Sequence, residues 1–235
     1  MKSIGIIGGM GPMATVDLFR RIVMGTPAQS DREHIRIFID NNTAIPDRTQ
    51  ALLHGGEDPV PEMVNSAIRL EAMGADFLIM PCNTAHAFYD RLLPFVHVPI
   101  LHMIRETLED TRRRNIPKVG LLATDGTIRT RVYHDVFEQA GIELILPDAQ
   151  GQEELMRLIY QGVKAGRANY DTAPLRRALD ETLSRGAQAL ILGCTELPLA
   201  FAQYEGLSPY PAIDPTAILA AAAIREAGIR TGGKK

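Results

Sequence analysis

The chain has 235 residues, of which 46% are hydrophobic and 23% are charged, and its formal net charge at pH 7 is -3. These values are typical of a globular protein with one or two domains, and they exclude disordered and fibrous classes. No apolar run approaches the roughly 18 residues that cross a bilayer, and the only tight basic cluster is 112–114, so we expect a cytoplasmic protein with neither a membrane nor a nucleic acid as partner.

Short apolar runs alternate with amphipathic stretches along the chain, a pattern typical of an α/β fold with parallel sheets. The predicted strands are, in chain order, 3–7, 35–39, 77–80, 118–123, 143–146 and 189–192, with two short ones near Ile100 and Ala212. The predicted helices are 12–23, 62–73, 102–113, 129–139, 153–165, 175–185 and 216–227. Pro12 suits the first turn of its helix, where the backbone N–H has no helical partner.

The two halves of the chain are related by an internal repeat. Residues 74–83 (GADFLIMPCN) align without a gap on residues 186–195 (GAQALILGCT). The segment from Ile4 pairs with the segment from Val119 at nearly the same offset. We infer two similar α/β domains with parallel four-stranded sheets related by internal pseudo-symmetry. The first is expected to cover residues 1–101 with 210–235, and the second residues 102–209.

The repeat places the chain's two cysteines at equivalent positions. Cys82 and Cys194 each follow a buried strand and precede a helical segment, so each is expected at the carboxyl edge of its sheet, where open α/β folds bind ligands. A helix N-terminus lowers the pKa of a thiol, which favours a thiolate there. One cysteine alone is better explained as a small buried hydrophobe. Two thiols across a cleft suit a carbon acid that loses a proton from one face and regains it on the other, which is racemisation or epimerisation.

Six motifs carry a resemblance to a known family: IGIIGGMGP, NNxxIPDRT, MPCNTAHAFY, LLATDGTI, YQGVKAG and LGCTELPL. The sequence resembles the aspartate/glutamate racemase superfamily, most closely its cofactor-independent aspartate racemases, from residue 4 to about 215. The resemblance implies two α/β domains with the active site in the cleft between them, usually in a homodimer. It also implies Cys82 and Cys194 as the acid and the base, with no pyridoxal phosphate or other cofactor and no metal.

The resemblance further assigns the substrate contacts. Arg48 and Lys164 match the cations that receive the side-chain carboxylate, for which a guanidinium offers two parallel hydrogen bonds. Arg48 lies in a polar connection, 41–58, that we expect to act as a lid. The other predicted substrate contacts are Met10, Thr49, Gln50, Asn83, Thr84, Ala85, Thr127 and Thr195.

Several residues near these motifs admit more than one interpretation. Asp17, Asp40 and Glu196 are candidates for tuning the thiols, and Glu196, directly after Thr195, is the best of the three. His86 has the spacing of a helical metal pair with Cys82, but no further His or Cys lies nearby, which favours a packing role.

Alternative functions differ in class. Within the superfamily, a glutamate, broad-specificity or hydantoin racemase or a maleate isomerase-like enzyme would share these motifs. Gly9-x-Gly11-x-x-Ala14 after a strand fits a dinucleotide fingerprint, but that function leaves the cysteine repeat unexplained. A non-enzymatic amino-acid-binding protein would need the cations and not the two thiols. We therefore expect an aspartate racemase, an isomerase acting on an acidic amino acid.

Overall fold

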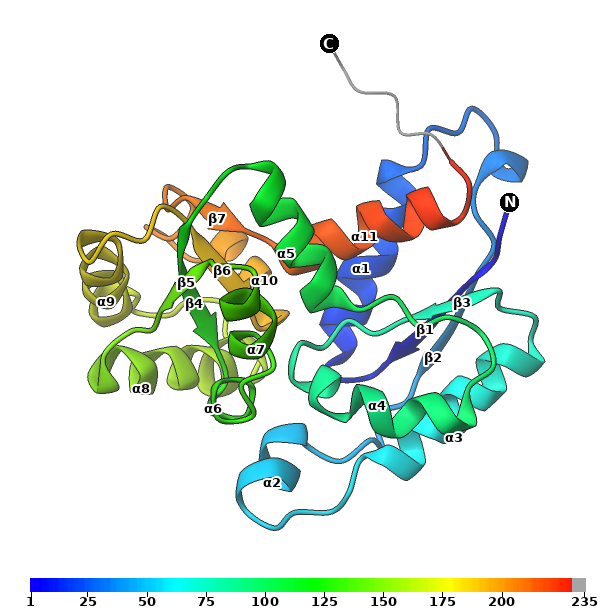
Figure 1. Cartoon of the computed structure of the whole chain (residues 1–235), viewed down its shortest axis with the longest axis horizontal. Helices are drawn as coiled ribbons and strands as arrows, with labels where there is room; N and C mark the ends of the chain where they lie inside the picture. Colours follow the sequence, from blue (N-terminus) through cyan, green and yellow to red (C-terminus); the bar gives the residue numbers. More distant parts are fainter. Residues whose placement is uncertain (230–235) are drawn as a thin grey trace. The chain divides into compact units, whose positions relative to one another are not determined.

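The computed structural model describes residues 1–229, which form two compact units, each built around one parallel sheet (Figure 1). Unit 1 comprises Met1–Glu106 and the C-terminal segment from Thr216, and unit 2 comprises Thr107–Pro215. The helix α5 (Met103–Arg113) contains the first boundary between the units. Within the described residues, no helix combines the length and the apolar character needed to cross a membrane.

Unit 1 has a parallel sheet with the strand order β2-β1-β3. Its strands are β1 (Ile4–Gly8), β2 (Ile37–Asn41) and β3 (Phe77–Ile79), and its other helices are α1 (Pro12–Gly25), α2 (Arg48–Leu53), α3 (Val60–Ala72), α4 (Tyr89–Leu92) and α11 (Pro215–Glu226), with short 3₁₀ helices η1 (Asp31–Glu33), η2 (Thr84–Phe88) and η3 (Leu93–Phe95). A single parallel bridge joins Leu78 of β3 to Ile100. The four-stranded sheet expected here is therefore three strands and one bridge.

The central strand β1 is buried on both faces, and its alternate side chains enter different clusters. Ile4 and Ile6 pack with Leu18 of α1 and with α11, whereas Ile7 packs with side chains of α3. Figure 1 shows α1 and α11 on one side of this sheet and α3 on the other. Each such apolar side chain contributes about 1.5–3 kcal/mol through burial. The sheet is thus fixed between two helical layers, and its carboxyl edge is held rigidly.

Unit 2 repeats this plan with a four-stranded parallel sheet in the order β5-β4-β6-β7. The strands are β4 (Lys118–Ala123), β5 (Glu143–Ile145), β6 (Leu190–Gly193) and β7 (Ala212–Ile213). The helices are α6 (Asp125–Arg129), α7 (His134–Gln139), α8 (Ala149–Arg157), α9 (Ala173–Ser184) and α10 (Glu196–Gln203), with a π-helical segment η4 (Leu158–Val163). The expectation of a four-stranded parallel sheet is confirmed for this unit.

The sequence repeat corresponds to equivalent packing in the two sheets. Gly5 pairs with Leu78 in unit 1, and Gly120 pairs with Leu190 in unit 2. A Cβ on either glycine would lie 2.5 or 2.6 Å from Cδ2 of the paired leucine, so each position admits only glycine without repacking. Leu78 bridges to Ile100 and Leu190 pairs with Ala212, which makes those two segments equivalent as well. The pseudo-symmetry predicted from sequence is therefore present in the strand register.

The structure departs from the predicted helices in several places. The helix expected over 129–139 is broken into α6 and α7, because the Thr130 hydroxyl bonds back to the Gly126 carbonyl and Arg131 adopts a left-handed φ of 56°. The helix expected from residue 153 begins at Ala149, because the Asp148 side chain caps it through the Gly151 N–H (2.7 Å). The connection 41–58 contains the unpredicted helix α2.

Candidate active site

Cys82 lies just beyond β3 in unit 1 and is 6% exposed. It is a free thiol in the hydrophobic cluster that also contains Met10, Ile45 and Ala85. The helical segment predicted after it is the 3₁₀ helix η2. Asn83, Thr84 and Ala85 are buried beside the thiol, so three of the predicted substrate contacts lie in one rigid turn.

The carbonyl of Cys82 is bonded to a buried histidine. Nδ1 of His86 lies 2.9 Å from this oxygen, and Nε2 accepts the Met103 N–H at 3.1 Å. A backbone N–H can only donate, so Nε2 is unprotonated and Nδ1 carries the proton. Burial lowers the pKa of His86 to about 4, which keeps the ring neutral near pH 7.

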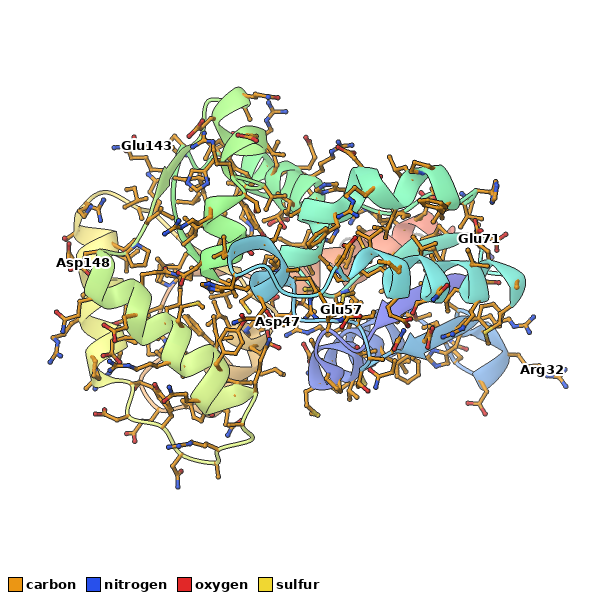
Figure 2. The ribbon with its side chains drawn as sticks, turned by 90° about the horizontal axis from the view of Figure 1, so that it is seen from below. Arg32, Asp47, Glu57, Glu71, Glu143 and Asp148 are labelled. Atoms are coloured by element: carbon orange, nitrogen blue, oxygen red, sulfur yellow. The ribbon has the colours of Figure 1, made fainter. Side chains whose placement is uncertain are left out.

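Arg48 is the first residue of α2 and is buried, with 7% of its surface exposed. Its guanidinium donates to the backbone carbonyls of Ile45 (3.3 Å), Pro46 (2.9 Å) and Met10 (3.0 Å). The Arg48 guanidinium is therefore held at the carboxyl edge of the sheet. The prediction of a polar lid over 41–58 did not include these contacts. Asp47, labelled in Figure 2, caps α2 by accepting the Gln50 N–H at 2.9 Å. Thr49 is buried, and Gln50 is exposed.

The β1–α1 loop of unit 1 fits closely against the loop after β2. Gly9 has a φ of +88°, and a Cβ there would lie 2.3 Å from the Asn42 carbonyl. Its N–H donates to the Thr15 hydroxyl at 3.0 Å. The glycine that fitted a dinucleotide fingerprint is therefore required by backbone packing at this position.

Cys194 directly follows β6 in unit 2 and is 7% exposed. Its Sγ donates to Oε2 of Glu196 at 2.9 Å, and the Thr195 hydroxyl lies 3.4 Å from the same oxygen. Glu196 begins α10 and is itself buried. The structure thus brings Cys194, Thr195 and Glu196 into one hydrogen-bonded group.

The pKa of the Cys194 thiol lies well above its ordinary value. Burial is the main cause, the negative charge of Glu196 acts in the same direction, and the positive charge of Lys164 acts against both. From the sequence we expected the helix N-terminus to favour a thiolate, and for Cys194 that expectation is wrong. Desolvation and a neighbouring carboxylate outweigh the helix dipole, so this thiol is protonated at neutral pH.

Lys164 follows the π-helical segment η4, and its N–H bonds to the Ile159 carbonyl at 3.0 Å. Its ammonium lies 4.5 Å from the centre of the Tyr160 ring. Its positive charge is among the causes that lower the pKa of Cys194. Thr127 is fully buried in α6, where its N–H lies 3.3 Å from the hydroxyl of the cap Thr124.

Tyr133 and Asp214 were not predicted from the sequence as residues of the site. Tyr133 is fully buried, and its pKa is raised mainly by burial, with the charges of Asp214 and Cys194 acting in the same direction. Asp214 directly follows β7. Its position at the carboxyl end of a parallel strand is the signal by which it could have been found.

The remaining candidates are resolved by their contacts. Asp17 pairs with Arg20 and Arg21 along α1, so it is a helix ion-pair residue and not a partner of a thiol. Asp40 pairs with Arg69 at 3.4 Å. Of the three acidic residues weighed from the sequence, Glu196 is the one that contacts a cysteine. In residues 1–229, no three His, Cys, Asp or Glu side chains gather as a metal site requires.

The fold and the two equivalent cysteines can now be compared with known protein families. The Asp/Glu/Hydantoin racemase profile matches residues 7–223, and the chain belongs to this family. It is accordingly an enzyme, an isomerase of the racemase type, and the alternative of a non-enzymatic binding protein is not retained.

Individual relatives support the same class. The broad specificity amino-acid racemase RacX of Bacillus subtilis is 30% identical over 92% of this chain and 94% of its own length. The structure of Picrophilus torridus aspartate racemase superposes with a TM-score of 0.83 at 33% identity, covering 98% of this chain and 96% of the other. A glutamate racemase of Corynebacterium glutamicum is 30% identical over 61% of this chain and 54% of its own length.

Proposed function

We propose that this enzyme racemises aspartate without pyridoxal phosphate, with Cys82 and Cys194 as its two acid–base groups. The observation that carries the proposal is the equivalence of the two thiols. Both follow equivalent strands, both are free and buried, and each is next to a small polar residue. A single structural cysteine would not need a counterpart at the matching position of the repeat.

The chemistry requires one thiolate and one thiol at the same time. The thiolate takes the α-proton from one face of the substrate, and the thiol gives its proton to the other face, so the two sulfurs exchange protonation states in each turnover. A reacting carbon at about 3–3.5 Å from each sulfur requires the sulfurs to be about 6.5–8 Å apart.

The environment of Cys194 supports a defined starting state. Because its pKa is raised, Cys194 is the thiol of the resting enzyme and acts as the acid in the first half of the proposed cycle. Cys82 is then the base. Glu196 maintains the proton on Cys194 through the 2.9 Å hydrogen bond, and Lys164 opposes it, so the thiolate remains accessible for the reverse direction.

The two carboxylates of the substrate are assigned to different sets of residues. Asn83, Thr84 and Ala85 of unit 1, with Thr127 and Thr195 of unit 2, are proposed to bind the α-carboxylate. Arg48 and Lys164 are proposed to bind the side-chain carboxylate. Met10, whose carbonyl receives the Arg48 guanidinium, and Thr49 are proposed to line the pocket, and Gln50, which is exposed, is the least supported contact.

A substrate panel tests this function. The protein is incubated separately with L-aspartate, L-glutamate and L-alanine, and the D enantiomers are measured by chiral chromatography. We expect D-aspartate to form fastest. Equal rates with all three amino acids would replace the proposal with a broad-specificity racemase, as the relationship to RacX suggests. D-glutamate alone would make it a glutamate racemase.

Two further proposals concern the setting of the enzyme. We propose a homodimer, because α1 exposes the large apolar side chains of Met13 (62%), Val16 (55%) and Met24 (76%), and such patches are typical of interfaces. A dimeric mass by light scattering is expected, and a monomeric mass would contradict it.

We also propose a cytoplasmic location, because two catalytic thiols must stay reduced.

A further inference from the structure

His86 is the buried titratable group closest to Cys82 that the proposed chemistry does not use. It is 3% exposed, and both ring nitrogens are engaged by the backbone. Its ring lies 4.7 Å from the ring of His102, which in turn lies 4.7 Å from that of Tyr89. A residue that served only to fill space would not need two directed hydrogen bonds, one in which it donates and one in which it accepts.

The two bonds join two segments of unit 1. Nδ1–H holds the Cys82 carbonyl, and Nε2 holds the N–H of Met103, the first residue of α5. The hydroxyl of Tyr89 makes a parallel connection by donating to the Ile100 carbonyl at 3.2 Å. The turn that carries the thiol is thereby fastened to the segment 100–103, whose bridge to Leu78 belongs to the sheet.

The first bond also sets the direction of a neighbouring donor. The peptide between Cys82 and Asn83 is planar and trans, so its N–H points opposite to its carbonyl. With the carbonyl held toward the buried imidazole, the Asn83 N–H is directed away from it. Asn83 is one of the residues proposed above to bind the α-carboxylate, and this N–H is a donor that it can offer.

We propose that His86 is a positioning residue, which fixes the Cys82–Asn83 peptide and thereby the relative orientation of the first thiol and the carboxylate-binding turn. This inference rests on the proposed function of Cys82. His86 itself exchanges no proton with the substrate. It acts as a neutral imidazole with the proton on Nδ1.

Two substitutions separate the two bonds. In His86→Asn the amide can replace the Nδ1–H donor to Cys82, and in His86→Gln the longer side chain can replace the Nε2 acceptor for Met103. His97→Gln is the matched control, because the His97 side chain is 90% exposed in the same unit. The readouts are the rate of racemisation and the rates at which iodoacetamide alkylates Cys82 and Cys194, each measured by peptide mass mapping.

We expect His86→Gln to lower kcat by about 10- to 100-fold, with a smaller loss in His86→Asn, because a displacement of about 1 Å costs rates of that order. The alkylation rate of Cys82 should change in His86→Gln, whereas that of Cys194, in unit 2, should not. The positioning role would be overturned if the alkylation rate of Cys82 were unchanged in both variants. It would also be overturned if His86→Asn and His86→Gln lowered kcat equally. Altered Cys82 alkylation in an enzyme that racemises no amino acid would instead contradict the proposed function and leave the positioning intact.

A measurement on the unmodified protein covers the case in which the variants do not fold. In long-range ¹H–¹⁵N spectra of histidine-labelled protein, His86 should show the Nδ1–H tautomer from pH 6 to 8. The Nε2–H tautomer, or a protonated ring in that range, would overturn the proposal.

Discussion

Two residues of the same type occupy equivalent positions, yet the groups around them differ. Cys194 donates to the buried carboxylate of Glu196, whereas the carbonyl of Cys82 is held by the neutral His86. A helix N-terminus favours a thiolate by at most about 1–2 kcal/mol, and at Cys194 desolvation and the carboxylate exceed it. The pKa of Cys194 is raised by burial and by the carboxylate, which keeps this thiol protonated and suits the role of acid in the proposed two-base reaction.

Glu196→Gln is expected to lower the pKa of Cys194, because the substitution removes the negative charge while burial, the larger cause, remains. Alkylation of Cys194 by iodoacetamide at pH 8 should therefore become faster, and racemisation should slow by about 10²-fold. The control is Glu143→Gln, an exposed glutamate of the same unit that is labelled in Figure 2. Its carboxylate pairs with Lys118. Unaltered Cys194 alkylation in Glu196→Gln would show that the carboxylate does not act on the thiol.

Arg48→Ala is expected to raise KM and lower kcat for aspartate, with a loss of about 10²-fold in kcat/KM, which corresponds to about 3 kcal/mol. Arg48→Lys should rescue little, because an ammonium cannot reproduce the guanidinium bonds to the Pro46 and Met10 carbonyls. Steady-state kinetics measures both variants, with the exposed Arg91→Ala as the control. Unchanged aspartate turnover in Arg48→Ala, together with equal wild-type rates on alanine, would remove the acidic-substrate assignment.

At the scale of elements, strands were better predicted than helices and turns. The strand over Lys118–Ala123 was predicted at its exact bounds because buried parallel strands are continuous apolar runs. The helix α2 was missed because it is only six residues long, although its N-cap Asp47 stands three residues before Gln50, which is a local signal for a helix start. The break between α6 and α7 depends on one hydroxyl bonding back to its own helix, which periodicity does not detect.

The turn after β3 carries an acid-sensitive element. Burial lowers the pKa of His86 to about 4 and that of His102 to about 3, so the unfolded chain binds more protons than the folded one below pH 6.5. Stability is therefore full above pH 6.5 and falls as the pH decreases toward 4. For His86 alone the loss between pH 7 and pH 5 is about 2 kcal/mol.

Urea unfolding at pH 7 and pH 5 measures this effect. His86→Asn should show a smaller loss of unfolding free energy between the two pH values than the wild type, even if it is less stable at pH 7. An equal loss in wild type and variant would mean that His86 does not titrate between the folded and unfolded states in this range.

At the scale of the whole molecule, the repeat links sequence to chemistry. Gly5 with Leu78 and Gly120 with Leu190 show that the two sheets share one register, and the same alignment pairs Cys82 with Cys194. Sequence alone therefore indicated the parallel α/β class, the paired thiols and the family. It also singled out Glu196 as a candidate partner of a thiol, which the contact with Cys194 supports. It did not reveal the roles of His86 and Tyr133, because these depend on side-chain orientation and burial, which spacing does not determine.

The central claim is that the two cysteines act on opposite faces of one α-carbon. The most direct test incubates L-aspartate in deuterated water with the wild type, Cys82→Ala and Cys194→Ala, and follows both α-deuterium incorporation and D-aspartate formation. We expect the wild type to form α-deuterated D-aspartate, and each single variant to form none, although one of them can still exchange the α-proton of one enantiomer with retention. Formation of D-aspartate at the wild-type rate by either variant would contradict the two-cysteine account.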